Sequence, residues 1–155
     1  MIIFKEIDKS NYMECINLRI KKEQKGFVAD NAQSLVEAKF EEGLYTRAIY
    51  SDDTMVGFVL FDYDPEIPGW SMSRFMIGEQ YQGRGLGKEA VKQFLKYMKE
   101  EMNIHELYIS VEVENVNACE MYEKIGFHFV KSVAYEFGGV MYKEKQMKIE
   151  LQVNG

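Results

Sequence analysis

The feature that most constrains this chain is a glycine-rich turn, residues 82–87, which reads QGRGLG. An apolar run from Trp70 to Ile77 precedes the turn and has the pattern of a strand, and an amphipathic run typical of a helix follows it. Glycines at the start of a helix leave backbone N–H groups exposed beside the positive end of the helix dipole. Such a row of donors is well suited to bind phosphate. The turn therefore predicts an anion-binding site between a strand and a helix.

The length and composition indicate one compact domain covering residues 1–155. Hydrophobic residues make up 46% of the chain and charged residues 28%, which provides material for a core and carries no signature of disorder. The net charge is −6 and no basic run is present, so nucleic acid is not expected as a partner. The acidity serves solubility, or it favours a cationic small molecule.

Neither metal ligands nor targeting segments stand out in the sequence. Cys15 and Cys119 are far from each other and from His105 and His128, so no metal site is expected. The first eight residues have no positively charged leader, and no apolar run is long enough to span a bilayer. We therefore expect a cytoplasmic protein that has no membrane partner.

The first half of the chain is interpreted as a strand, two helices and three further strands. The second helix ends at Gly43, and its expected apolar stripe consists of Leu35, Val36, Ala38 and Phe40. The three later strands follow one another most simply as an antiparallel meander. The expected strands of this half are 2–7, 45–50, 55–63 and 70–77.

The second half places helices beside the remaining strands. The helix after the glycines has a lysine-rich face and an opposite apolar face formed by Leu86, Ala90, Val91, Phe94, Leu95 and Met98. The strand at 107–113 should lie parallel to the strand at 70–77, because a helix connects the two. A helix at 116–124 then ends at Gly126, and two strands follow, 127–135 and 140–151. The pattern predicts a mixed sheet with helices on both sides, an α+β or α/β fold.

Three kinds of phosphate-binding loop compete for the glycine-rich turn. A P-loop requires Ser or Thr after its lysine, but Glu89 follows Lys88 and the spacing of the glycines is one residue short. A dinucleotide-binding fingerprint can be placed on residues 85–90, but too little chain remains for the larger doubly wound domain that it normally opens. The third pattern, Q-x-x-G-x-G from Gln82 to Gly87, is that of the pyrophosphate loop in the GNAT acetyltransferases.

A second motif, further along the chain, supports the third interpretation. Residues 115–127, NVNACEMYEKIGF, resemble the second GNAT signature, N-x-x-A-x-x-x-Y-x-K-x-G-F, and follow the first signature in the family's order and at its usual separation. The chain thus resembles the GNAT family over essentially its whole length. The resemblance implies an α+β fold, an α/β sandwich whose mixed, mostly antiparallel sheet has about seven strands and is covered by about four helices.

The resemblance also implies acetyl-CoA as a co-substrate, held where the strand at 70–77 splays from the strand at 107–113. The backbone of Phe75, Met76 and Ile77 would pair with the pantetheine arm like an added strand. Asn115 and Asn117 would contact the cofactor as well, unless Asn115 only caps the short helix. The pyrophosphate would be held by the N–H groups of Gln82, Gly83, Arg84, Gly85, Leu86, Gly87 and Lys88.

Acyl transfer to an amine needs an oxyanion stabiliser and an acid for the departing thiolate. Tyr122 matches the family's tyrosine, so the resemblance assigns its hydroxyl the role of that acid; the alternative is an aromatic side chain that only packs in the core. A backbone N–H near Met76 or Ile77 is the expected oxyanion donor.

The proton acceptor for the attacking amine stays open at this point. Several relatives carry a glutamate on the strand before the glycine loop, but residues 70–77 contain no carboxylate. Waters, a carboxylate elsewhere such as Asp62, Asp64 or Glu112, or an unassisted amine remain as alternatives. Cys119 has no apparent histidine partner and is expected to be a packed thiol.

The acceptor is expected to be a small-molecule amine. Residues 25–35 and 141–147 resemble the corresponding parts of bacterial spermine/spermidine (diamine) acetyltransferases, which implies a polyamine held by carboxylates and aromatic rings. Alternatives are another primary amine, such as an antibiotic, an amino acid or a protein N-terminus, and a catalytically idle acyl-CoA sensor. The terminal strands of family members often mediate dimers, so a homodimer is one expected assembly. The candidate acceptor residues are Glu23, Phe27, Asp30, Asp62 and Asp64.

Overall fold

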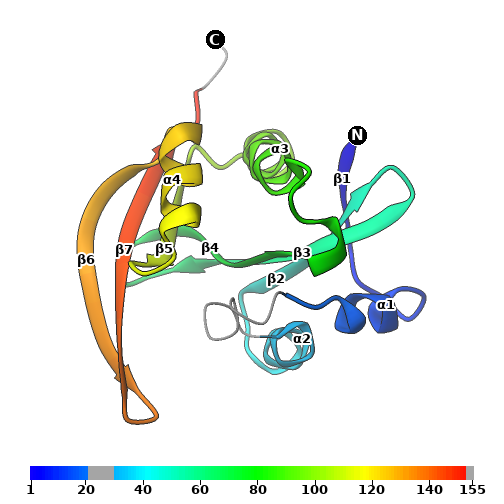
Figure 1. Cartoon of the computed structure of the whole chain (residues 1–155), viewed down its shortest axis with the longest axis horizontal. Helices are drawn as coiled ribbons and strands as arrows, with labels where there is room; N and C mark the ends of the chain where they lie inside the picture. The colour runs from blue at the N-terminus through cyan, green and yellow to red at the C-terminus, as the bar shows by residue number, and fades with distance from the viewer. Residues whose placement is uncertain (21–29, 153–155) are drawn as a thin grey trace.

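The computed structural model describes residues 1–20 and 30–152, and its strands form one seven-stranded sheet (Figure 1). The strand order across the sheet is β1-β2-β3-β4-β5-β7-β6. The strands are β1 (Ile2–Lys5), β2 (Leu44–Ser51), β3 (Thr54–Asp64), β4 (Gly69–Ile77), β5 (Glu106–Glu112), β6 (His128–Phe137) and β7 (Val140–Glu150). The described helices are α1 (Tyr12–Asn17), α2 (Asn31–Phe40), α3 (Leu86–Glu100) and α4 (Val116–Ile125), with a short 3₁₀ turn, η2 (Glu79–Tyr81).

The pairing of the strands matches the predicted fold class. β1 to β4 pair antiparallel in sequence order, so the predicted meander is confirmed. β4 and β5 are parallel and are connected through α3, as the strand–helix–strand pattern predicted. β7 lies between β5 and β6 and is antiparallel to both. The α+β fold with a mixed, mostly antiparallel sheet is therefore confirmed.

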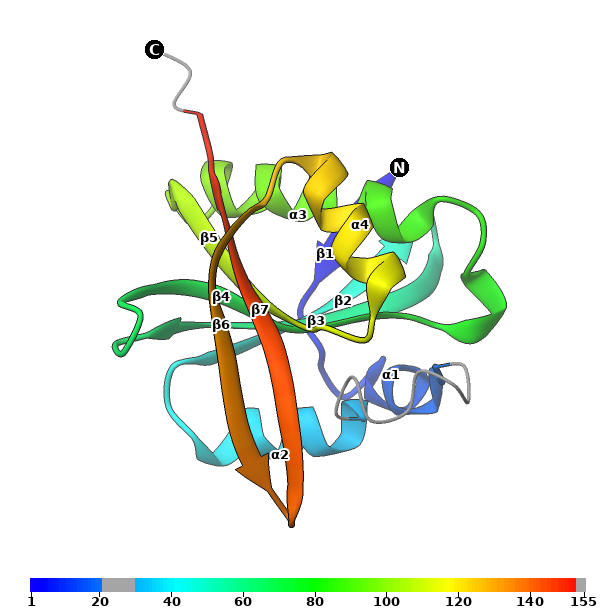
Figure 2. The same ribbon diagram turned by 60° about the vertical axis from the view of Figure 1, so that its left-hand side comes forward.

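Helices cover both faces of the sheet (Figures 1 and 2). α3 and α4 lie on one face, where the larger core includes Val59, Phe61 and Phe94. α1 and α2 lie on the other face, where a smaller core includes Cys15 and Phe58. No helix in the described ranges is both long enough and apolar enough to cross a bilayer.

The predicted buried face of α3 agrees with the structure. The helix runs for 15 residues, and a stripe at helical spacing is buried against the sheet. Leu86, at the start of the stripe, is only partly buried and packs at the edge of the same core. The fully covered positions are Ala90, Val91, Phe94, Leu95 and Met98.

The predicted apolar stripe of α2 is wrong at two of its positions. Val36 is 58% exposed and Phe40 is 81% exposed, whereas the polar residues Asn31 and Ser34 are buried. Asn31 Nδ2 donates to the backbone oxygen of Cys15 at 2.9 Å, and Ser34 Oγ donates to a carbonyl one turn earlier at 3.1 Å. These hydrogen bonds offset the cost of burying polar groups, and they turn the helix about its axis relative to the expected orientation.

Candidate active site

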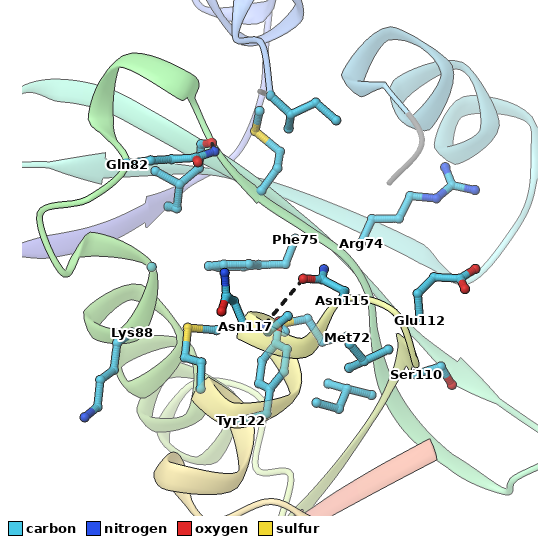
Figure 3. Close-up of a pocket in the computed structure, with 18 of the residues that line it drawn as sticks. Met72, Arg74, Phe75, Gln82, Lys88, Ser110, Glu112, Asn115, Asn117 and Tyr122 are labelled. Carbon is cyan, nitrogen blue, oxygen red and sulfur yellow. Dashed lines mark hydrogen bonds between the residues drawn. The ribbon is translucent and has the colours of Figure 1, made fainter. Parts of the chain in front are cut away.

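The site lies where β4 and β5 separate. The two strands pair only at Ser71 and Tyr108, so beyond this pair their facing backbone edges diverge. A cavity of about 460 Å³ occupies the gap, between the glycine loop at the start of α3 and the first turns of α4 (Figure 3). A parallel pair that opens in this way offers backbone donors and acceptors to a ligand that lies between the strands.

A β-bulge in β4 stands at the point of separation. Leu60 and Phe61 are adjacent on β3, but their partners on β4 are Arg74 and Met72, so Ser73 is an extra residue. One extra residue reverses the alternation of side chains between the two faces. Accordingly, Met72 packs in the core below α3, whereas Arg74 reaches α2 on the opposite face. Bulges of this kind bend a strand, which accounts for the divergence of β4 from β5.

The glycine loop has a backbone that only glycine adopts readily. Gly83 has φ +79° and Gly85, the N-cap of α3, has φ +76°. Gln82 Nε2 donates to the Ile77 backbone oxygen at 2.8 Å and so ties the loop to the end of β4. The N-cap Gly85 has no side chain and none of the described side chains caps α3 in its place, while the first N–H groups of a helix have no partner within it. The loop therefore presents donors and a positive dipole end at the cavity.

Gly87 differs from Gly83 and Gly85 in its backbone conformation. Its φ is not positive, and a Cβ at this position would meet only Ile77 Cγ1 at 3.8 Å and Met121 Sδ at 4.0 Å, which are ordinary contacts. The protein itself therefore leaves room for a side chain at Gly87. Since Gly87 lines the cavity, the space beside it is available to a ligand that approaches the backbone closely.

The cavity brings together most of the residues predicted to bind the cofactor. Arg84 is exposed and Leu86 packs against the core, and neither side chain lines the cavity; their predicted contribution concerned backbone N–H groups. The predicted cofactor-binding residues in the wall are Phe75, Met76, Ile77, Gln82, Gly83, Gly85, Gly87, Lys88, Asn115 and Asn117.

Asn115 combines the two functions that the sequence left open. Its Oδ1 accepts a hydrogen bond from the Ala118 backbone N–H at 3.4 Å, so it is the N-cap of α4. It also lines the cavity, and the Nδ2 group of its amide is a further donor beside the capping oxygen. Capping therefore does not exclude contact with a ligand.

Tyr122 lies in the cavity wall and is 7% exposed. Its ring packs edge-to-face on Phe127, with 5.4 Å between the ring centroids. Burial, with a smaller contribution from Cys119, raises the pKa of the Tyr122 hydroxyl above its ordinary value. The hydroxyl is therefore protonated at neutral pH and can act as a proton donor. In Figure 3, Tyr122 lies between Lys88 at one side of the view and Glu112 at the other.

Cys119 is a packed thiol, as the sequence suggested. It is buried, and its Sγ donates to the Glu112 backbone oxygen at 3.8 Å. Burial is the main cause that raises the pKa of this thiol, which keeps it in the protonated form. Among the described residues, no group of His, Cys, Asp or Glu is placed to hold a metal ion.

The candidate acceptor residues are not gathered in the cavity wall. Glu23 and Phe27 lie outside the described residues. Asp30 caps α2 by accepting from the Gln33 N–H at 2.7 Å. Asp64 accepts from the Glu66 N–H at 2.9 Å in the turn before β4.

Asp62 does not line the cavity either. It accepts a hydrogen bond from the hydroxyl of Ser73, a residue of the wall. Burial is the main cause that raises the pKa of the Asp62 carboxyl. Ser73 therefore stands between this carboxylate and the ligand space.

Arg74 is the main residue of the site that the sequence pattern did not indicate. It lines the cavity, pairs with Glu37 on α2 at 2.5 Å and donates to Ser34 Oγ at 3.0 Å. A hydrogen bond from Gln33, followed by the Arg74 guanidinium, holds the pKa of Glu37 below its usual range. The bulge at Ser73 directs Arg74 to this face, and local sequence gives no signal for that bulge.

Comparisons with known proteins agree with the fold. A sequence model of the Acetyltransferase (GNAT) family matches residues 7–127. The spermine/spermidine N(1)-acetyltransferase of Bacillus subtilis (strain 168) is 27% identical over 150 residues, which cover 92% of this chain and 98% of that protein. An N-alpha-acetyltransferase of Saccharolobus solfataricus is 27% identical over 106 residues, covering 62% of this chain and 64% of that protein.

A solved structure has the same fold. The spermidine N-acetyltransferase from Vibrio cholerae, in complex with CoA and spermine, superposes with a TM-score of 0.75 at 18% sequence identity. The match covers 96% of this chain and 95% of that chain. The family match spans most of the sequence, and the chain belongs to the GNAT family of acetyltransferases. It is an acetyl-CoA-dependent N-acetyltransferase, and the predicted resemblance is confirmed.

The residues present fit the cofactor of that family. The cavity is of the size of a small-molecule site, and its wall contains an uncapped helix N-terminus and the cradle at Gly87 that a Cβ would partly fill.

Proposed function

We propose that this protein transfers the acetyl group of acetyl-CoA to a primary amine of a polyamine such as spermidine or spermine. The main support is the relative of Bacillus subtilis, whose name states this activity and which aligns with almost the whole chain. The formal charge of −6 suits a polycationic acceptor, since opposite charge raises the rate of encounter.

In the proposed complex, the glycine loop from Gln82 to Lys88 holds the pyrophosphate through backbone N–H groups. The open edge of β4 at Phe75, Met76 and Ile77 pairs with the pantetheine arm, and Asn115 and Asn117 contact it from α4. A backbone N–H near Met76 or Ile77 donates to the oxyanion of the tetrahedral intermediate. Tyr122 gives its proton to the sulfur as the C–S bond breaks.

The test is release of the CoA thiol from acetyl-CoA in the presence of a panel of amines. The panel contains spermidine, spermine, putrescine, single amino acids and a short peptide with a free N-terminus. We expect the highest kcat/KM with spermidine or spermine. Acetyl-CoA binding without turnover on any amine would contradict the enzymatic function and favour the acyl-CoA sensor instead.

A second acceptor class has its own support. The relative of Saccharolobus solfataricus is an N-alpha-acetyltransferase, so a protein N-terminus remains an alternative acceptor. A peptide that outcompetes polyamines in the panel would establish this alternative. Localisation in the cytoplasm, assembly as a homodimer and a single domain over residues 1–155 stay predictions.

Substitution of Gly87 by Ala is expected to separate ligand binding from folding. The new Cβ fits against Ile77 and Met121, and Ala is favoured over Gly in a helix by up to about 1 kcal/mol. The free energy of unfolding should therefore be unchanged or slightly raised. The affinity for acetyl-CoA should fall by about tenfold or more, because the Cβ occupies space beside the backbone that the proposed ligand needs.

Calorimetry with acetyl-CoA, together with urea unfolding, measures both effects. Unchanged acetyl-CoA affinity in a stable Gly87→Ala variant would move the proposed pyrophosphate site away from this loop.

A further inference from the structure

The cavity contains one carboxylate among the described residues of its wall, and that is Glu112. No histidine lines the cavity there, and its described cationic side chains, Arg74 and Lys88, cannot accept a proton from an ammonium group. Asp62 lies behind Ser73, to which it is hydrogen-bonded. An acceptor amine is mostly protonated at neutral pH, so the choice of a proton acceptor in the wall reduces to Glu112.

The position of Glu112 is fixed by its own backbone. Its carbonyl oxygen accepts from the Asn115 N–H at 3.0 Å and from Cys119 Sγ at 3.8 Å, at the junction of β5 and α4. Leu107, Ile109 and Val111 point into the core below α3, so alternation along β5 directs Glu112 to the opposite face. This is the face toward which the bulge turns Arg74, across the gap between the two strands (Figure 3).

Among the described side chains, none forms an ion pair with Glu112. Arg74 is paired with Glu37 instead. On β7, Glu144 stands directly opposite Glu112, and on β6 the hydroxyl of Tyr135 is hydrogen-bonded to Glu144. Glu114 follows two residues later. Like charges on opposite cross-strand positions repel each other, which favours a cation or a proton between them.

Besides burial, the repulsion between these carboxylates contributes to raised pKa values at Glu112 and Glu144. Burial, followed by the charge of Glu114, raises the pKa of Glu112. Burial, followed by the charge of Glu112, raises the pKa of Glu144. A carboxylate with a raised pKa is a stronger base when it is ionised.

We propose that Glu112 is the general base that deprotonates the acceptor amine. This inference rests on the proposed acetyl transfer. The ammonium group gives one proton to the Glu112 carboxylate, the neutral nitrogen attacks the thioester carbon, and a C–N bond forms. The C–S bond then breaks, and Tyr122 gives its proton to the sulfur. The nitrogen loses its second proton, which restores Tyr122, and Glu112 releases the first proton to water.

The test compares Glu112→Gln with Glu114→Gln. The second variant is a matched control, because Glu114 also loses a carboxylate but is exposed and does not line the cavity. With spermidine as acceptor, kcat/KM of Glu112→Gln should fall by roughly 10²- to 10⁴-fold, the usual contribution of a general base. The fall in activity toward acid pH, which reports protonation of Glu112 in the wild type, should disappear. Glu114→Gln should keep the rate and move this acid limb to lower pH, because one charge that raises the pKa of Glu112 is gone.

Two control measurements test whether folding and cofactor binding are intact. The thermal unfolding temperature and the acetyl-CoA affinity of both variants should match those of the wild type. The raised folded pKa of Glu112 means that its ionised form opposes folding near neutral pH, so the Gln variant has no charge-based reason to unfold. Glu112→Asp keeps a carboxylate and should retain the acid limb at a reduced rate.

Three outcomes would overturn the proposal. The first is a Glu112→Gln variant whose kcat/KM is within about threefold of the wild-type value, and the second is a fall in activity toward acid pH that persists in this variant. The third is a change in KM alone, which would mean that Glu112 only binds the cationic substrate. If the wild type acetylates another amine and not spermidine, the same comparison is made with that amine. Absence of turnover on every amine would contradict the proposed function itself.

Discussion

Replacement of Tyr122 by Phe should lower kcat by roughly 10²- to 10⁴-fold, the range that general acid catalysis supplies. The phenyl ring can keep its edge-to-face packing on Phe127, so the substitution removes the hydroxyl and little else. Acetyl-CoA affinity and thermal stability should therefore remain near those of the wild type. Stopped assays of CoA thiol release under saturating acetyl-CoA measure the effect.

The pH dependence provides a second measure of the role of Tyr122. Burial raises the pKa of its hydroxyl above the ordinary value of 10.0, so the donor stays protonated throughout the neutral and mildly alkaline range. Wild-type kcat should show no loss from deprotonation of Tyr122 below that value. Tyr50→Phe serves as the control, because Tyr50 is buried in the other core, among the residues that α1 and α2 cover. A Tyr122→Phe variant with kcat close to that of Tyr50→Phe would exclude the acid role.

The substitution Gly57→Ala should have the largest effect on stability. A Cβ at Gly57 would lie 2.4 Å from the backbone oxygen of Met76 and 2.9 Å from Ile77 Cδ1. The Met76 oxygen belongs to the neighbouring strand β4 and cannot move without breaking the β3–β4 pairing. We expect a loss of about 3 kcal/mol in the free energy of unfolding, at the upper end of the range for an overpacked interior.

Urea unfolding of Gly57→Ala and Gly87→Ala gives a matched comparison, since each adds one methyl group beside Ile77. Only the first methyl group meets a backbone atom at an impossible distance. Because Met76 and Ile77 line the cavity, Gly57→Ala should also weaken acetyl-CoA binding. Equal stability of the two variants would show that the strands shift apart at low cost.

Local patterns in the sequence predicted most of the elements. Apolar runs bounded by turn residues identified β2 to β4, and the stripe from Ala90 to Met98 identified a covering helix. Both patterns are local, because the residues of each run pack together on the sheet. The two GNAT signatures located the loop and α4, and with them two parts of the cavity wall. These parts depend on residues close together in the chain.

The parts that the sequence did not predict depend on contacts between distant residues. The buried face of α2 is set by Asn31 and Ser34, whose partners lie on α1 and on β4. The insertion of β7 between β5 and β6 is a long-range pairing with no local signal. The place of Glu112 opposite Glu144 follows from that insertion, so its charged surroundings could not be inferred from either strand alone.

The position of the extra residue, Ser73, determines which side chains of β4 lie on each face of the sheet at the cavity. Deleting Ser73 would remove the bulge and leave Met72 opposite Phe61 and Arg74 opposite Leu60, so the later side chains would keep their faces. Moving the bulge by one position, so that Arg74 becomes the extra residue, would instead place Ser73 opposite Leu60. In protein engineering, moving the bulge by one residue would therefore replace an arginine by a serine on the face of the sheet that α2 covers. Such a change would leave all four described helices with their present sequences.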